Sequence, residues 1–172
     1  MTKAADRRLR AWAVPVLEVW HGVFAGAYLV AFWTAEGNVG MHRTAGYLTL
    51  GLLVVRFLAA TAAPAGSPLA LPWATMRQWV GFVHSLSGRG ARALGGRHPL
   101  IPLSGLLLLA AVTLVVFTGA LMHGRGAREL HESLGNISLG IVTVHVGLIV
   151  GARAIRRLAA HPAAASPSGR TS

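Results

Sequence analysis

The chain has 172 residues, of which 53% are apolar and only 12% are charged, and its formal net charge is +11. The length corresponds to one domain, and the composition is too apolar for an ordinary soluble domain, so we expect a membrane protein. The absence of cysteine excludes disulfides and thiolate metal ligands.

Four apolar segments, each of about 20 residues, are long enough to cross a hydrocarbon core of roughly 30 Å. They lie near residues 14–35, 41–62, 100–122 and 133–153. The first follows a basic stretch, as a signal sequence would. Its apolar run is longer than that of a signal peptide and has no small-x-small cleavage site, so we interpret it as a retained span. The predicted fold is an all-α membrane protein, a bundle of four transmembrane helices.

The connections between these segments differ in length. A short turn over 36–40 makes the first two spans antiparallel neighbours, and a second short turn is expected over 123–130. The long connection 61–99 begins with a loop rich in Pro and Gly. Over 72–86, apolar residues recur at three- and four-residue spacing and Pro72 suits a helix start. We expect an interfacial helix on the cytoplasmic leaflet there, with a plain linker as the alternative.

The basic residues lie mainly on one side of the predicted membrane. With four spans, one side keeps only Arg43, Arg125 and Arg128, which leaves thirteen of the sixteen Lys and Arg residues for the side with both termini. This positive-inside bias places both termini in the cytoplasm, and the charge therefore reflects topology and attraction to anionic lipid, not nucleic-acid binding. We expect residues 1–157 to form the membrane domain and 158–172 a disordered cytoplasmic tail.

Four of the eight histidines lie inside or at the ends of the apolar segments, at two matching depths: His21, His42, His131 and His145. His131 and His145 are 14 residues apart, so both project from one helix face with roughly 21 Å between them along the axis. Histidine within a membrane span usually marks a functional site. Counting from the helix ends pairs His21 with His145 at an inner level and His42 with His131 at an outer level.

Two histidine pairs on facing helices suit two bis-histidine haems. There are no thiolates and few intramembrane carboxylates, and the pairs are too far apart to form one zinc site. Such coordination leaves no open position on iron, which disfavours oxygen chemistry there. For each histidine taken singly, the alternative is an interfacial or hydrogen-bonded core residue.

Residues on the ligand faces support the same interpretation. Small side chains four positions after a proposed ligand leave space for the edge of a macrocycle, at Ala25, Gly46 and Gly135. Arg56 is 14 residues after His42 and is expected to face the inner site, where a haem propionate would neutralise it. The alternative for Arg56 is an arginine that snorkels to the headgroups.

The other histidines are assigned different environments. His123 is a substitute ligand, a quinone-site group or a residue at a helix end near the negative dipole. His84 and His98, in the cytoplasmic connection, and His161, in the tail, are expected to be solvated.

Several short sequence elements occur in order between residues 14 and 157. They are Val19-Trp20-His21, Met41-His42-Arg43-Thr44-Ala45-Gly46-Tyr47, Val55-Arg56-Phe57, Gly95-Gly96-Arg97-His98-Pro99, Thr118-Gly119, Leu130-His131-Glu132-Ser133-Leu134-Gly135 and Val144-His145-Val146-Gly147. In these elements the sequence resembles the prokaryotic cytochrome b561 and nickel–iron hydrogenase b-type cytochrome subunit family. The Leu-His-Glu element followed 14 residues later by histidine is its most specific part.

The resemblance implies a diheme b-type cytochrome of the bacterial cytoplasmic membrane, with His21, His42, His131 and His145 as axial ligands of two haem b groups. Members of the family transfer electrons between a quinone pool and a hydrogenase or a periplasmic c-type cytochrome. We therefore expect an electron-transfer subunit whose partners are quinone, membrane lipid, a redox partner protein and a second copy of the chain. The alternatives are a standalone superoxide:quinone oxidoreductase and a haem-free membrane anchor.

The sequence departs from the family pattern in three places. Glu18 stands where a basic residue is expected, and Trp20 precedes the ligand instead of following it. The expected Gly-His-Asn-Pro before the third span is replaced by Gly-Arg-His-Pro, so no role is transferred to His98 from the family.

Overall fold

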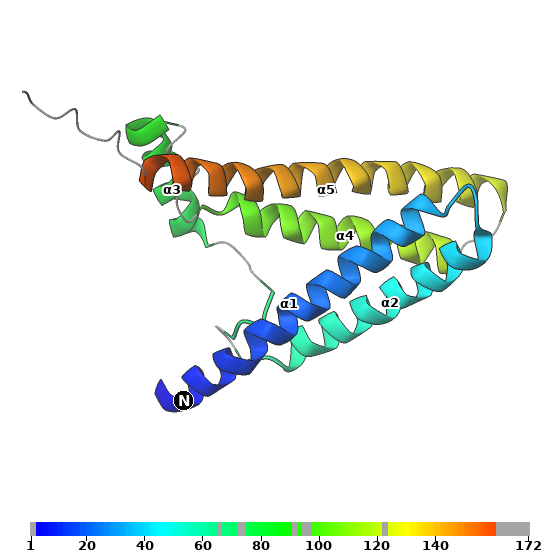
Figure 1. Ribbon diagram of the computed structural model, residues 1–172, viewed down its shortest axis with the longest axis horizontal. Helices are drawn as coiled ribbons and strands as arrows, with labels where there is room; N and C mark the ends of the chain where they lie inside the picture. Colours follow the sequence, from blue (N-terminus) through cyan, green and yellow to red (C-terminus); the bar gives the residue numbers. More distant parts are fainter. Residues whose placement is uncertain are drawn as a thin grey trace, which may run out of the picture. The chain divides into compact units, whose positions relative to one another are not determined.

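The computed structural model describes residues 3–64, 67–71, 75–90, 93, 98–121 and 124–160. Within these ranges the chain is all-helical, without strands. The helices are α1 (Lys3–Trp33), α2 (Val39–Ala62), α3 (Met76–Arg89), α4 (Leu100–Leu121) and α5 (Arg125–Ala160) (Figure 1). Four of them, all except α3, are long and apolar enough to cross a membrane. The prediction of an all-α chain with four such helices is confirmed.

Helix α5 is longer than the sequence pattern predicted. The turn expected over 123–130 is wrong from Arg125 onward, because α5 begins there, directly after Gly124. Gly124 has a φ of 103°, a conformation that glycine adopts without steric cost. Residues 125–130 contain Arg, Ala, Glu and Leu, which are good helix formers. The prediction missed this helical turn because it relied on apolar residues, and this segment is mainly polar. His131 therefore lies inside α5, whereas the turn predicted over 123–130 would have put it at the start of the helix.

At its other end α5 continues to Ala160, three residues beyond the domain boundary predicted at 157. The remainder of the predicted tail, residues 161–172, lies outside the described part of the chain.

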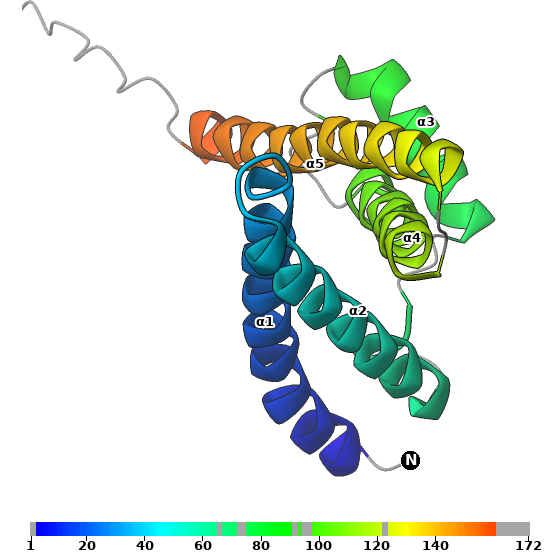
Figure 2. The ribbon, with the colours of Figure 1, turned by 90° about the vertical axis from the view of Figure 1, so that its right-hand side faces the viewer.

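Helices α1 and α2 form an antiparallel hairpin. The Asn38 side chain caps α2 by accepting a hydrogen bond from the Met41 N–H at 2.9 Å. The Trp20 indole N–H donates to the Leu52 carbonyl at 3.0 Å and joins the two helices near the middle of α2. Figure 1 shows them side by side, and Figure 2 shows the connecting turn at the top of the hairpin. A short turn between the first two spans is confirmed, but it lies at 34–38 and not at 36–40, because α1 ends at Trp33 and α2 begins at Val39.

Helix α3 has clear end signals. Thr75 and Gln78 form a capping box at its start, and Gly90, with a φ of 54°, donates its N–H to the Leu86 carbonyl at its end. The predicted start, Pro72, lies outside the described residues, and the described helix begins four residues later at Met76.

The chain divides into two compact units. The first comprises Met1–Pro72 and Leu106–Ile141, and the second Trp73–Gly105 and Val142–Ser172. The largest fully buried side chains all belong to the first unit: Thr49, Leu53, Val112 and Ser138. There the Ser138 hydroxyl donates to the Gly135 carbonyl, so its oxygen accepts the hydrogen bond from the Tyr28 hydroxyl at 2.7 Å. This bond joins α1 to α5.

Most long apolar side chains of the four candidate spans are exposed. Val19 is 68% exposed, Val55 58%, Leu107 52% and Val144 60%. Continuous apolar surface of this kind is rare on soluble monomers, and its natural solvent is lipid. The buried hydroxyl groups of these helices, such as that of Thr49, donate hydrogen bonds to carbonyls of their own helix. The exposed apolar surface and the length and composition of the helices therefore both suit a membrane environment.

Candidate functional site

The structure brings His42 and His131 together. Their ring centres are 5.9 Å apart, and their planes are almost perpendicular, at 81°. His42 lies in the first turn of α2, and His131 lies in the part of α5 that belongs to the same unit. Both side chains are half-buried. This pair is the outer pair of the sequence analysis.

Hydrogen bonds to neighbouring helices hold both rings. The Nδ1 atom of His42 is 2.7 Å from the Ala31 carbonyl oxygen on α1, and that of His131 is 2.9 Å from the Val115 carbonyl oxygen on α4. A carbonyl only accepts hydrogen bonds, so each Nδ1 carries the hydrogen. The lone pair of each neutral ring is therefore on Nε2. Histidines that bind metals almost always have this arrangement.

The ring of His131 lies directly against Gly119 of α4. A Cβ atom at Gly119 would lie 2.7 Å from Cε1 of the ring and 3.1 Å from Nδ1, so no other residue fits without moving the ring. Thr118 is close as well, with its hydroxyl oxygen 3.3 Å from Nδ1. That hydroxyl also donates to the Leu114 and Val115 carbonyls of its own helix. Sequence reasoning noted Thr118 and Gly119 without assigning them this contact.

His145 has a similar support in the second unit. Its Nδ1 lies 2.9 Å from the Ser104 hydroxyl oxygen on α4. The Ser104 hydroxyl is also 2.8 Å from the Ile101 carbonyl, to which it donates. Its oxygen therefore accepts from the Nδ1–H of His145, which again places the lone pair on Nε2. A Cβ atom at Gly105 would lie 3.6 Å from Cε1 of His145, an ordinary contact distance.

The two residues of α4 whose hydroxyls contact histidine rings have the same spacing as the histidines on α5. Ser104 and Thr118 are 14 residues apart, as are His131 and His145. Both hydroxyls also donate to the carbonyl three residues earlier. The contact between a hydroxyl residue of α4 and a histidine of α5 therefore recurs after 14 residues, which is about four helical turns. The apolar pattern of α4 did not indicate this repeat.

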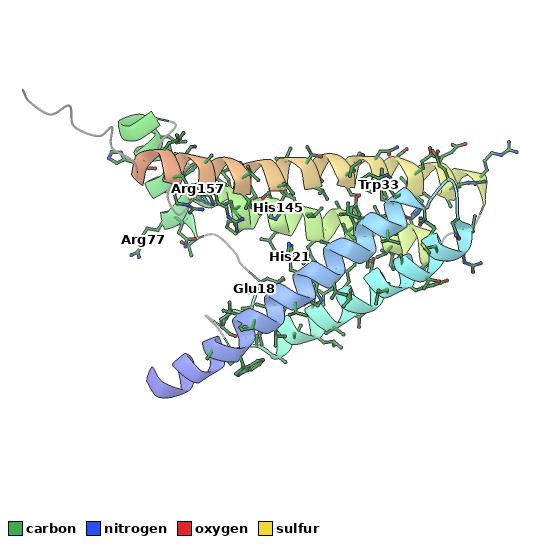
Figure 3. All side chains as sticks on the ribbon, viewed as in Figure 1. Glu18, His21, Trp33, Arg77, His145 and Arg157 are labelled. Atoms are coloured by element: carbon green, nitrogen blue, oxygen red, sulfur yellow. The ribbon has the colours of Figure 1, made fainter. Side chains whose placement is uncertain are left out.

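His21 is exposed on α1, next to Trp20, with the ring centres 6.4 Å apart (Figure 3). Trp20 in turn stacks on Phe24 at 4.9 Å. His21 belongs to the first unit and His145 to the second. The inner pair of the sequence analysis therefore stays a prediction.

Arg56 is buried and holds the loop that follows α2. It is 8% exposed, and its guanidinium donates to the Leu69 carbonyl at 2.6 Å and to the Ala70 carbonyl at 3.3 Å. Its charge also lies 6.0 Å from the centre of the Trp20 ring. Arg56 thus has a structural partner that sequence reasoning missed. A guanidinium has five N–H donors, so the predicted pairing with a propionate stays open as well.

Open space adjoins two of the three small residues singled out in the sequence. A Cβ atom at Gly46 or Gly135 would have nothing within 4 Å, so open space adjoins both. Ala25, the third small residue, is half-buried.

The prediction that His98 is solvated is wrong. The residue is 7% exposed because its ring packs against Phe82, with the ring centres 5.6 Å apart. Among the described residues neither of its ring nitrogens has a hydrogen-bond partner. His84 is exposed, as expected, whereas His123 and His161 lie outside the described residues.

The described residues include no group of three or more His, Cys, Asp or Glu side chains that could hold a metal ion. Among the described histidines, His42 and His131 bring their rings together, so the donors that could share one ion are these two imidazoles. Two imidazoles suit an ion whose remaining ligands come from a macrocycle. No protein-family model matches the chain, and no curated protein or solved structure matches it either.

Replacing Arg56 tests its structural role. Arg56→Met keeps an unbranched side chain that replaces the aliphatic part of the arginine, and it removes both hydrogen bonds to the loop, bonds of a type that contributes about 1.5–3 kcal/mol each. We expect proteinase K to cleave the 67–71 loop at least about ten times faster, the factor expected for loss of one of these bonds alone, since cleavage follows the population of the open form. The exposed Arg43→Met on the same helix is the control. Equal cleavage rates in the two variants would contradict the assigned role.

Proposed function

We propose that the chain is a membrane diheme b-type cytochrome that transfers electrons between the quinone pool and a redox partner protein. The partner is a hydrogenase or other dehydrogenase, or a periplasmic c-type cytochrome. The observation that supports the proposal best is the pair His42 and His131, with ring centres 5.9 Å apart and each Nδ1 hydrogen-bonded to a carbonyl. The resemblance noted in the sequence concerns the same histidines.

The arrangement of this pair would let both rings hold the same metal group. Their ring centres are 5.9 Å apart, and both side chains are half-buried in the same unit. The nitrogen available to a metal is Nε2 in both rings, because Nδ1 carries the hydrogen. The open space beside Gly46 and Gly135 gives room near the pair.

When bound, haem supplies a one-electron couple whose potential depends on the axial ligands and on their hydrogen bonds. The residues of the chain hold these ligands in place. The Ala31 and Val115 carbonyls orient the outer histidines, and Gly119 provides the flat surface against which the His131 ring rests. In the proposal, His21 and His145 hold the second haem, nearer the cytoplasm.

The proposed location is the bacterial cytoplasmic membrane, with both termini in the cytoplasm, supported by the distribution of Lys and Arg. Helix α3 would then lie on the inner leaflet. Its Met76, Val80 and Val83 follow one side of the helix and are 78%, 62% and 59% exposed, and Arg77 is exposed for contact with headgroups. Phe82 is buried on another side.

The proposed outer end carries balanced charge. Its exposed charged side chains in the described chain are Glu36, Arg43, Arg125, Arg128, Glu129 and Glu132. Three positive and three negative groups produce little net field, so long-range steering of a partner is weak. We therefore expect docking of a redox partner there to depend on local ion pairs.

Two alternative functions predict different behaviour of the purified protein and of its histidine variants. A standalone superoxide:quinone oxidoreductase would turn over as the purified chain, without a protein partner. A haem-free membrane anchor would be colourless and would keep its function when the histidines are replaced.

Histidine variants test the proposed haem sites. His42→Ala and His131→Ala should each remove the same haem, so that each variant and the double variant retain half of the wild-type haem per chain. The exposed His84→Ala should keep the full amount. Pyridine haemochrome assays of the detergent-purified proteins measure this. A double variant with less haem than either single variant would show that the two residues serve different sites.

The contact between Gly119 and His131 gives a second test. Gly119→Ala places a methyl group 2.7 Å from the ring and should displace it, whereas Gly105→Ala places one at 3.6 Å from His145 and should be tolerated. We expect Gly119→Ala to lose the outer haem at least ten times faster than the wild type. The reason is that loss of the contacts that orient a ligand typically costs 10–100-fold in metal affinity. The measurement is haem loss to apomyoglobin. Equal loss from both variants would contradict this packing.

A further inference from the structure

We propose that a cavity between His98 and α5 binds the head group of a membrane quinone, with His98 as its hydrogen-bond partner. The choice of a quinone rests on the proposed function, which this inference deepens by naming a site. The cavity has a volume of about 290 Å³, and its described walls belong to the second unit of the chain. This volume is at the lower end of the range for small-molecule sites and suits a single ring system with the start of its tail.

His98 is the residue that points to a ligand. It is 7% exposed, and among the described residues neither of its ring nitrogens has a hydrogen-bond partner. The Phe82 ring of α3 packs against the His98 ring, with the ring centres 5.6 Å apart. A buried polar group without a partner costs free energy, which a bound molecule with a complementary polar group would recover.

Helix α5 forms the rest of the described wall, from Val144 to Ile155, and contributes only apolar residues. These two positions are about 16 Å apart along the helix axis. Gly147 and Gly151 lie between them, about one turn apart, and a Cβ atom at either would have nothing within 4 Å. Without side chains these positions let a planar ring approach the helix backbone closely.

The chemistry of the wall favours an uncharged molecule from the membrane. The described wall contains no Arg or Lys, so the phosphate of a phospholipid would have no counter-charge there. Val144 is 60% exposed on a helix that is long and apolar enough to cross a membrane, so the cavity is open to molecules dissolved in lipid. A quinone has the required chemistry, because it carries uncharged oxygens on a flat ring with an apolar tail.

A neutral imidazole can bind both oxidation states of a quinone. One of its ring nitrogens carries a hydrogen and the other a lone pair. The N–H can donate to the carbonyl of the quinone, and the lone pair can accept from the hydroxyl of the quinol. His98 therefore suits a site that exchanges its ligand with the quinone pool.

The experiment measures photolabelling of the full-length protein in phospholipid nanodiscs by an azido-quinone. Mass spectrometry locates the labelled residues, and unlabelled decylubiquinone is the competitor. In the wild type we expect saturable labelling, suppressed by the competitor, at His98 or within residues 144–155, which form the cavity wall.

Four variants test the contacts. His98→Leu removes both ring nitrogens, and Gly151→Leu fills the cavity from α5. Each should need at least about ten times more azido-quinone for half-maximal labelling, the factor for loss of one hydrogen bond. His98→Gln keeps a donor and an acceptor and should stay within about threefold of the wild type. Gly140→Leu is the control, because Gly140 has the same open space at its Cβ position and lies outside the cavity wall.

The outcomes separate this inference from the proposed function. Labelling that does not saturate, or that saturates only elsewhere in the chain, would overturn the quinone site and indicate that lipid chains fill the cavity. Equal labelling of wild type, His98→Leu and Gly151→Leu would overturn it as well, and Gly151→Leu alone decides if His98→Leu does not fold. Haem per chain is measured on the same samples. Saturable labelling of the cavity in a chain without haem would overturn the proposed function and support the quinone site.

Discussion

The hydrogen bond from a histidine Nδ1 to an acceptor on a neighbouring helix is the interaction on which this account depends. His42, His131 and His145 each make one, to Ala31, Val115 and Ser104 respectively. A buried imidazole without such a partner would be costly in an apolar environment. The bond satisfies one ring nitrogen and commits the other to the role of acceptor or ligand. The histidines therefore belong both to the packing of the helices and to the candidate site.

Helix α4 has an unexpected role in this arrangement. Its sequence is apolar almost throughout, and its few polar or small residues lie where they meet the histidines of α5. Ser104 and Gly105 meet His145, and Thr118 and Gly119 meet His131. Small residues let a ring approach the helix backbone, and hydroxyl residues bond to their own helix and to the ring together. The long apolar side chains on the remaining surface suit contact with lipid.

Much of the fold could be predicted from the sequence because span length and hydropathy are local properties. The four apolar helices and the short α1–α2 turn follow from them. The start of α5 at Arg125 could not be predicted in this way, because a polar segment next to an apolar span has the same hydropathy as a turn. Counting depth from the helix ends paired His42 with His131, whose rings the structure brings together. The partners of Arg56 and the burial of His98 depend on contacts between distant segments, which no periodicity encodes.

The most direct test of the central claim is the number of haem groups bound by the purified chain. The measurement is a dithionite-reduced minus oxidised spectrum of the detergent-purified protein from haem-supplied cells, with haem quantified by pyridine haemochrome. The account predicts two b-type haems per chain with low-spin, six-coordinate spectra. A colourless protein that is correctly folded would contradict it and would favour a haem-free membrane anchor.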